Sequence, residues 1–260
     1  MYSIQENCFW QGETVIAQKI TKIVDYVKDD FKGYYLIEGT PSPDLIATIA
    51  TRYLVDTLKL LKIAHIENPS IVPIVRISNG IAEHPIRIYA SKEYKILVLL
   101  SDQLIDNNQM FGFSDALIEW AEKKKVKGII SLLGMAPNNT MQGIYGAGNT
   151  KNIHELLKAH GVQILENGLI SGVSAELLIL AKKIDACILL ANPGHSTNFD
   201  CAAKLLELLG AVFKFEINTQ PLEQESKKII SAIKEKMQQI YAQQQTTQGN
   251  KKEDKGMMFT

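Results

Sequence analysis

The chain has 260 residues, of which 46% are hydrophobic and 22% are charged, so it can build a sizeable core as one large domain or as one domain with an appendage. Lysine and arginine together number 28, as do aspartate and glutamate, so no net positive field is available to hold nucleic acid or an acidic membrane surface. Nucleic-acid binding is therefore disfavoured, and no membrane partner is expected.

The cysteines and the first residues point to a cytoplasmic protein. Cys8, Cys187 and Cys201 form no CxxC pair, so they predict neither a disulfide framework nor a zinc knuckle, and a reducing compartment is expected. The N-terminus has no basic segment followed by an apolar one, and charged residues interrupt the longest apolar stretches before they could span a bilayer.

From residue 34 onward, short apolar runs rich in β-branched residues alternate with helical patterns. The expected strands cover residues 34–38, 71–77, 86–90, 95–100, 126–133, 162–165 and 186–191. The expected helices cover residues 42–62, 114–125, 150–160, 171–183 and 196–209. This alternation predicts an α/β domain with a mostly parallel or mixed sheet and helices on both faces, and the strands clustered between residues 71 and 100 suggest some antiparallel pairing.

Several helix boundaries follow from local signals. Ser42 is the expected N-cap of the first helix, with Pro43 at the first helical position and Asp44 in the first turn. Residues 171–183 are apolar on nearly every side, which predicts burial of that helix. Gly210 is expected to end the helix over residues 196–209.

The chain divides into three predicted parts. Residues 1–220 form the α/β domain, and residues 221–242 form an amphipathic C-terminal helix that packs on the domain or on a sister subunit. Residues 243–260 begin with a Gln-rich polar run that has no apolar period, which predicts a disordered, flexible tether.

The tether ends in Met258, Phe259 and Thr260. An apolar residue, an aromatic ring and a free carboxylate on a flexible segment suit a pocket on another protein. A solvated tail that cannot bury apolar surface normally stays polar to its last residue, so this ending indicates a binding partner.

Two glycine-containing segments could hold an anion. Residues 143–150 (GIYGAGNT) have the spacing of a P-loop, but Asn149 stands where the phosphate-binding lysine must be, so nucleotide hydrolysis is disfavoured. The other interpretation is a glycine-rich loop with unusual dihedral angles or close backbone approach. Residues 39–44 (GTPSPD) deliver a helix N-terminus at the end of a strand, although Asp44 adds negative charge there and favours a capped helix start without a ligand.

Nucleophilic and metal chemistry find little support in the pattern. His195 and Cys201 could form a Cys/His pair, but Cys201 lies within a helical apolar pattern and no third orienting residue is identifiable. The remaining histidines, His65, His84, His154 and His160, show no paired-ligand spacing, so no metal site is expected.

Four segments together resemble the archaeal branch of the proteasome assembly chaperone family. They are residues 39–44 with the following helix, 128–135 (GIISLLGM), 170–178 (ISGVSAELL) and 200–209 (DCAAKLLELL). The resemblance spans about residues 10–215 and implies an α/β fold related in outline to nucleoside phosphorylases. It also implies binding to proteasome α subunits without known catalysis or a cofactor. The family often has glycine where this chain has Ser42 and Met135, which weakens the case for an inherited small-molecule pocket.

Under this resemblance the tail matches a docking motif of hydrophobic residue, tyrosine and any residue, which inserts between neighbouring proteasome α subunits. Met258 takes the hydrophobic position, Phe259 replaces tyrosine, and Thr260 supplies the carboxylate. The expected function is that of an ATP-independent, homo-oligomeric assembly chaperone or activator of the proteasome core particle. The alternative is a small-molecule enzyme of phosphorylase-like outline that uses residues 39–44 or 143–150 as an anion loop.

Overall fold

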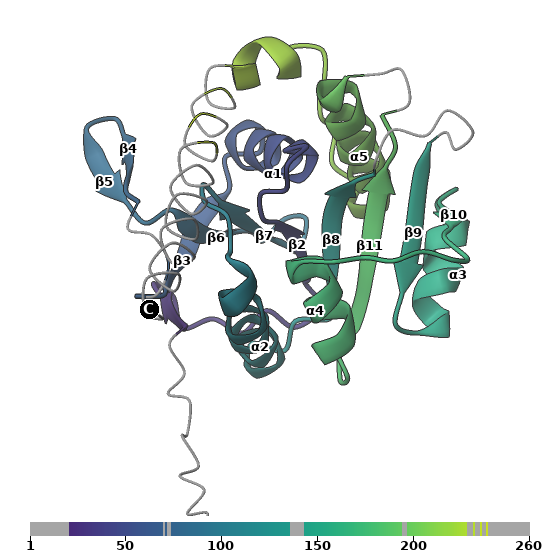
Figure 1. Ribbon diagram of the computed structural model, residues 1–260, viewed down its shortest axis with the longest axis horizontal. Coiled ribbons are helices and arrows are strands. Elements are labelled where there is room, and N and C mark those ends of the chain that lie inside the picture. The colour runs from purple at the N-terminus through teal and green to yellow at the C-terminus, as the bar shows by residue number, and fades with distance from the viewer. Residues whose placement is uncertain are drawn as a thin grey trace, which may run out of the picture.

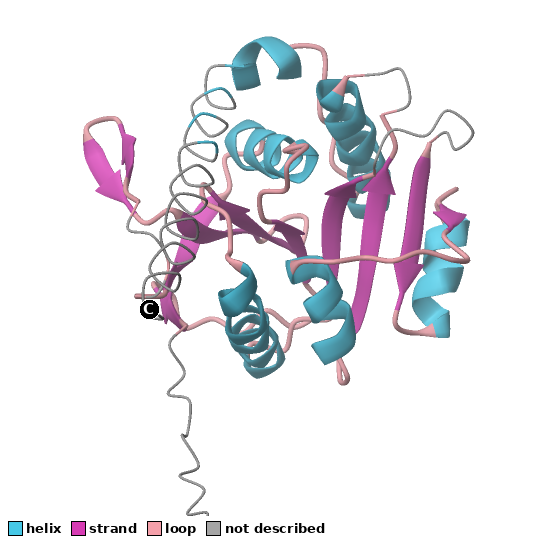
Figure 2. Ribbon diagram, viewed as in Figure 1, coloured by secondary structure: helices cyan, strands magenta, loops and turns pink. Residues whose placement is uncertain are grey.

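The computed structural model describes residues 21–69, 71, 74–135, 143–193 and 197–227, together with residues 231, 235 and 238. Its centre is a nine-stranded mixed sheet in the order β1-β3-β6-β7-β2-β8-β11-β9-β10 (Figure 1). A separate two-stranded hairpin, β4-β5, projects from the end of the molecule that carries β3 and β6 (Figure 2). The predicted α/β class, with a mixed sheet covered by helices, is confirmed.

The elements have the following bounds. The strands are β1 (Lys22–Asp25), β2 (Tyr35–Gly39), β3 (Leu61–Glu67), β4 (Arg76–Ser78), β5 (Ile81–Glu83), β6 (Ile86–Ser91), β7 (Ile96–Ser101), β8 (Gly128–Gly134), β9 (Ile144–Gly148), β10 (Gln163–Ile164) and β11 (Asp185–Ala191). The helices are α1 (Ile46–Thr57), α2 (Asn107–Lys123), α3 (Lys151–Ala159), α4 (Val173–Leu180) and α5 (Asn198–Phe213).

The middle of the sheet is parallel and its flanks are mixed. β2 pairs in parallel with both β7 and β8, and β11 extends the parallel block by pairing with β8. On one side β7, β6, β3 and β1 pair antiparallel in succession, which confirms antiparallel pairing in the first half of the chain. On the other side β9 is antiparallel to β11 and parallel to β10.

Helices cover both faces because successive side chains of the central strands point to opposite sides. In β2, for example, Leu36 joins the core under α2 and α4, whereas Ile37 joins the core under α1, α3 and α5. In Figure 1, α1 lies above and α2 below the half of the sheet that contains β6 and β7. The near-continuous apolar runs of β7 and β11 are typical of strands buried on both faces.

The first helix begins later and ends earlier than the sequence predicted. Leu45 takes a left-handed conformation with φ 60°, and α1 starts at Ile46, so the expected N-cap role of Ser42 is wrong. The carboxylate of Asp44 instead accepts the Ile46 amide at 2.8 Å and the Ser42 hydroxyl at 3.1 Å. At the other end the chain reverses through Lys59, with φ 49°, and continues as β3 rather than as helix.

Other boundaries also differ from the predictions. Only the end of the strand expected over residues 71–77 is a strand, because β4 begins at Arg76; residues 71, 74 and 75 lie outside any strand, and residues 72 and 73 lie outside the described part. α2 starts at Asn107, seven residues before the expected Ser114. α4 is buried only in part, since its Ile179 side chain is 68% exposed.

Gly210 does not end α5, which continues to Phe213 before the chain turns at Lys214. A Cβ atom at position 210 would lie 2.8 Å from the Phe215 carbonyl oxygen, so glycine lets the returning chain pack against the helix. Residues 222–227 are helical, and most of the remainder of the expected C-terminal helix over 221–242 lies outside the described residues. Among the helices that the structure describes, none is long and apolar enough to cross a membrane.

Candidate functional site

The carboxyl edge of the sheet is the first place to look for a site, since α/β proteins often bind anions where strands end and helices begin. Here the β2–α1 loop, the end of β8 and the start of α5 converge. A Cβ atom at Gly134 would lie 2.5 Å from the carboxyl carbon of Asp44, and the Asn198 amide donates to the Asp44 carbonyl at 2.7 Å.

Asp44 therefore fills the space in which an anion would be bound. Its carboxylate already accepts the Ile46 amide, the first of the helix, so a negative charge of the chain itself lies at the start of α1. An incoming phosphate would have to displace this carboxylate. The geometry favours the capped helix start over an anion loop at residues 39–44.

A buried carboxylate next to this edge was not identified from the sequence. Glu38, at the end of β2, is fully buried. One carboxylate oxygen accepts the backbone amide and the hydroxyl of Thr40, both at 2.6 Å, and the other accepts the Ser174 hydroxyl at 3.1 Å. These three bonds satisfy the carboxylate and tie β2 to α4. The only signal in the sequence was an acidic residue inside an otherwise apolar strand.

The glycine-rich segment is not a phosphate loop. Residues 144–148 form β9, which pairs antiparallel with β11, so the P-loop interpretation is wrong. Close backbone approach explains two of the glycines: a Cβ at Gly146 would lie 2.9 Å from Val162, and one at Gly148 would lie 2.3 Å from Ile153. Of the three glycines in this segment, Gly143, Gly146 and Gly148, only Gly143 has a positive φ, of 98°.

The two polar residues after β9 have structural roles. Asn149 donates to the Ala181 carbonyl at 2.6 Å and accepts the Ala186 amide at 2.9 Å, which fixes the chain before α3. Thr150 is the N-cap of α3 and accepts the Ile153 amide at 3.3 Å. These bonds account for the side chains that stand in the Lys-Ser/Thr positions of the rejected motif.

The thiols in the described residues are poor nucleophiles. Cys201 is buried inside α5, and burial raises the pKa of its thiol. Burial also raises the pKa of Cys187 to about 12. A nucleophilic cysteine needs a lowered pKa and access to substrate, so neither residue fits that role. His195, the suggested partner of Cys201, lies outside the described residues.

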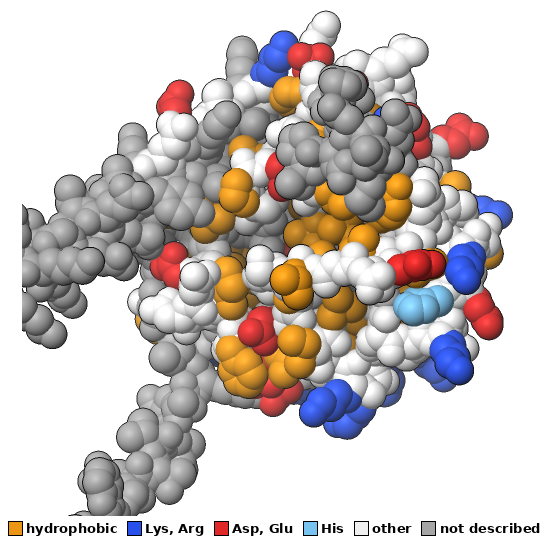
Figure 3. Space-filling model, turned by 45° about the vertical axis from the view of Figure 1, so that its right-hand side comes forward, with side chains coloured by type: hydrophobic (Ala, Val, Ile, Leu, Met, Phe, Trp, Pro, Cys, Tyr) orange, Lys and Arg blue, Asp and Glu red, His pale blue; other side chains and the backbone are white. Residues whose placement is uncertain are grey.

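Two surfaces expose large apolar side chains that a monomer would ordinarily keep covered. On the β4-β5 hairpin and the residue before it, Val75, Ile77 and Ile81 are 59%, 62% and 68% exposed. A second group lies over α4 and the segment that precedes it, where Leu169 and Ile179 are exposed (Figure 3). Exposed apolar patches often mark interaction sites. The sequence did not reveal them, because an apolar residue in a strand or helix pattern is first assigned to the core.

The hairpin is anchored by a buried ionic network. The Asp102 carboxylate accepts from Arg52 of α1, from Arg87 of β6 at 2.7 Å and from Arg76 of β4 at 3.4 Å. Glu83 of β5 adds a bond to Arg87 at 3.3 Å. These contacts hold the base of the projecting hairpin against α1 and the sheet.

The predicted tail residues Met258, Phe259 and Thr260 lie outside the described residues, so their docking role stays a prediction. Within the described residues the sheet edge is filled by the chain's own carboxylates, and the apolar surface is displayed by a hairpin and a helix. These features define a mixed α/β domain whose exposed apolar side chains lie on a projecting hairpin and a helix.

The chain belongs to the PAC2 family, whose model matches residues 36–237. A relative from Methanocaldococcus jannaschii, an uncharacterized protein, is 29% identical over 221 residues, which cover 84% of this chain and 91% of the relative. The family expected from the sequence is confirmed.

Solved structures show the same fold. Pyrococcus furiosus PbaA, described as an archaeal homolog of proteasome-assembly chaperone, superposes with a TM-score of 0.75 at 23% identity and covers 86% of this chain and 99% of its own. P. furiosus PbaB, described as an archaeal proteasome activator, gives a TM-score of 0.66 at 21% identity over 84% of this chain and 98% of its own.

Proposed function

We propose that this protein is an ATP-independent proteasome-binding protein, either an assembly chaperone or an activator of the core particle. The observation that carries the proposal is the combination of a PAC2 domain over residues 36–237 with a chain that ends in Met258, Phe259 and Thr260. The likeness of the fold to PbaA and PbaB supports the same role, because their descriptions name proteasome assembly and proteasome activation.

The proposed contact is insertion of the tail between neighbouring α subunits. Met258 and Phe259 would enter an apolar groove, and the carboxylate of Thr260 would pair with a lysine of the pocket. Phenylalanine keeps the ring of the tyrosine motif but lacks its hydroxyl. Where the pocket hydrogen-bonds that hydroxyl, the loss costs about 0.5–1.5 kcal/mol per tail.

A single three-residue tail binds weakly, because it buries little surface and its tether loses freedom on binding. We therefore propose a homo-oligomer that presents several tails to one α ring, since effective concentration then raises the overall affinity. The exposed side chains of Val75, Ile77 and Ile81 support self-association, and a second copy of the chain is the proposed cover for this hairpin. The cytoplasm is the proposed compartment.

The test uses the full-length protein, a variant lacking residues 258–260, and the single variants Phe259→Ala and Phe259→Tyr. Each is mixed with archaeal core particles, and co-migration on native gels is measured together with hydrolysis of a fluorogenic peptide. Gln248→Ala, a change in the same tether but outside the motif, is the matched control. Light scattering of each variant reports its oligomeric state.

Deletion and Phe259→Ala should abolish binding and any stimulation, Phe259→Tyr should preserve or strengthen binding, and Gln248→Ala should leave it unchanged. Binding without stimulation would assign the protein to assembly, whereas stimulation of peptide hydrolysis would assign it to activation. Undiminished binding by the deletion variant would refute tail docking. A monomeric mass would refute the oligomer.

The alternative of a small-molecule enzyme gains no support from the candidate loops. Asp44 fills the edge at residues 39–44, and residues 144–148 form a strand. No acid, base and nucleophile set converges in the portion of the chain that the structure describes.

A further inference from the structure

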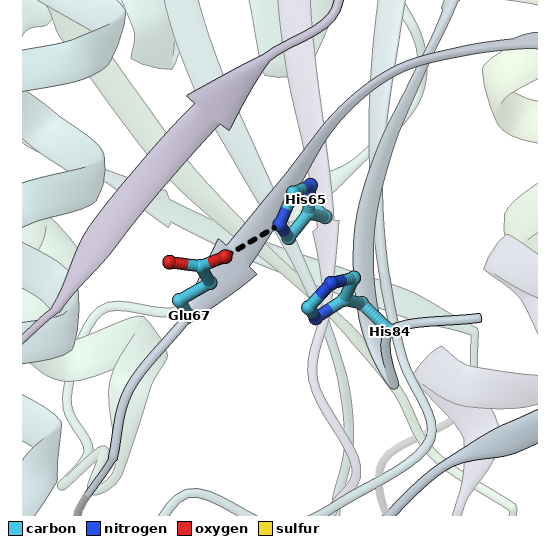
Figure 4. A group of neighbouring side chains, drawn as sticks. All are labelled: His65, Glu67 and His84. Carbon is cyan, nitrogen blue, oxygen red and sulfur yellow. Dashed lines mark hydrogen bonds and ion pairs between the residues drawn. The ribbon is translucent and has the colours of Figure 1, made fainter. Parts of the chain in front are cut away.

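Three potential metal ligands gather at the base of the β4-β5 hairpin. His65 and Glu67 are two residues apart on β3, so their side chains point to the same face of the strand. His84 follows β5 directly and leads into β6, the strand that pairs with β3. One ligand atom from each of the three residues lies within 4.8 Å of the others (Figure 4).

The cluster combines one fixed ligand with two adjustable ones. The His65 side chain is only 7% exposed, and its ring stacks on His84 at 3.7 Å and on Tyr26 at 5.3 Å between centroids. Its Nε2 atom lies 3.0 Å from a carboxylate oxygen of Glu67, whose side chain is 45% exposed. Glu67 can therefore move without disturbing the core, and so can His84 at the surface.

Two cations beside the cluster are already paired with carboxylates, and a third, Lys22, lies opposite Glu67 in the β1–β3 register. Lys62 bonds to Glu83 at 2.6 Å, and Arg87, which lies opposite His65 in the strand register, bonds to Glu83 and Asp102. Their charges are thus partly compensated, and the carboxylate of Glu67 remains available to balance the charge of a bound cation.

We propose that His65, Glu67 and His84 bind one divalent transition-metal ion per chain, with Zn²⁺ as the best-suited ion. Two imidazoles and one carboxylate are a donor set that zinc accepts in tetrahedral geometry, with the fourth position open to water. Ligand atoms around such an ion at 2.0–2.1 Å lie roughly 3.3 Å apart. Rotation of the Glu67 and His84 side chains toward His65 would shorten the separations of the three ligand atoms, which now lie within 4.8 Å of one another, to this distance.

The same geometry limits the affinity. Nδ1 of His65 is buried and has no hydrogen-bond partner among the residues that the structure describes. Without metal, the ring proton on Nε2 is donated to Glu67; metal binding at Nε2 shifts that proton to Nδ1, where no acceptor awaits it. Since groups that hydrogen-bond a ligand imidazole are worth about 10–100-fold in metal affinity, the site should bind zinc that much more weakly than a fully supported one.

A bound ion would clamp the end of β5 to β3 and so fix the direction in which the apolar hairpin projects. No metal site was expected from the sequence because the histidines show no paired-ligand spacing, and the whole hairpin separates His65 from His84. Their proximity arises only when β6 returns beside β3.

The experiment uses full-length, tag-free protein stripped with a chelator, in a Cys8→Ser background that removes a competing thiol. Zn²⁺ binding is measured by calorimetry, and Co²⁺ binding by visible absorption, which distinguishes nitrogen and oxygen ligands from sulfur. His84→Gln and Glu67→Gln are the test variants because both residues lie at the surface. His154→Gln removes a histidine on α3 and is the matched control.

The parent protein should bind one Zn²⁺ per chain, and Co²⁺ should give visible bands without a thiolate charge-transfer band. His84→Gln should weaken Zn²⁺ binding by about 100-fold or more, because loss of a ligand exceeds the 10–100-fold cost of losing a group that only orients one. His154→Gln should bind as the parent does. The proposal would be overturned if the parent bound neither ion. It would also be overturned if His84→Gln and Glu67→Gln, with native circular dichroism, bound Zn²⁺ as tightly as the parent.

Discussion

Replacement of Asp102 by alanine should strongly destabilise the domain. The Asp102 side chain is 8% exposed, and it is the acceptor shared by Arg52 and Arg87, whose side chains are 4% and 1% exposed. Burial lowers the pKa of Arg52, and the charge of Asp102 opposes that effect. Asp102→Ala therefore leaves two guanidinium groups buried without their main counter-charge.

Removal of one partner from a buried ion pair typically costs about 3–5 kcal/mol. We expect a loss of this size in the free energy of unfolding at pH 7, or roughly 6–20 °C in Tm at the 2–4 °C per kcal/mol typical of large domains. Lys183→Ala is the matched control, because its pair with Glu122 leaves the Lys183 side chain 78% exposed. A surface pair of this kind contributes about 0–1 kcal/mol.

Urea unfolding followed by tryptophan fluorescence and by circular dichroism would measure these differences. The triple variant Arg52→Met, Arg87→Met and Asp102→Leu replaces the buried charges with apolar groups, and should recover most of the stability lost in Asp102→Ala. A loss below about 1 kcal/mol in Asp102→Ala, with unchanged denaturant dependence, would refute the claim that unpaired buried charge dominates here.

Gly148→Ala should lower the free energy of unfolding by about 1–3 kcal/mol in the same assay, because the new Cβ would lie 2.3 Å from Ile153. Gly112→Ala lies inside α2, and its new Cβ would meet no atom within 4 Å, so this change should raise the free energy of unfolding by about 0.5–1 kcal/mol. Equal effects at both positions would contradict the packing argument. Hydrogen bonds from the Thr197 backbone and hydroxyl lower the pKa of Asp200. The ionised carboxylate therefore stabilises the folded protein at pH values above the unfolded pKa of about 3.9, and this stabilisation is lost as the pH falls through the folded pKa. Asp200→Asn should cost about 0.3–1 kcal/mol at pH 7 and progressively less as the pH falls below about 4, and a pH-independent difference would contradict the charge-based explanation.

The central strands could be predicted because their signal is local. β7 and β11 are uninterrupted apolar runs of suitable length, and burial on both faces is the simplest explanation of such a run. The family could be predicted from four short segments. The fold class followed from the alternation of strand and helix patterns, without any knowledge of strand order.

The errors arose where the deciding contact is distant in the sequence. Gly143 and Gly148 have P-loop spacing, which the sequence could only disfavour through Asn149; the packing of later residues against β9 shows that Gly146 makes room for Val162 and Gly148 for Ile153. The start of β3 was assigned to the preceding helix because Leu58 and Leu61 continue the helical period, while the reversal depends on the left-handed conformation of Lys59. Lysine carries no local signal for that conformation.

The filled sheet edge bears directly on what kind of function this domain can serve. At the N-terminus of α1, where amide groups ordinarily attract a phosphate, the Ile46 amide donates to the carboxylate of Asp44, and Gly134 is small enough to let that carboxylate lie over the end of β8. A ligand there would have to break a bond that the fold already makes. The apolar side chains of the β4-β5 hairpin, by contrast, remain exposed to water in the single chain. Covering them would be favourable because it would remove apolar surface from water. Among the described residues, the apolar surface left uncovered therefore lies on the outside of the hairpin, for which a protein partner is the proposed cover.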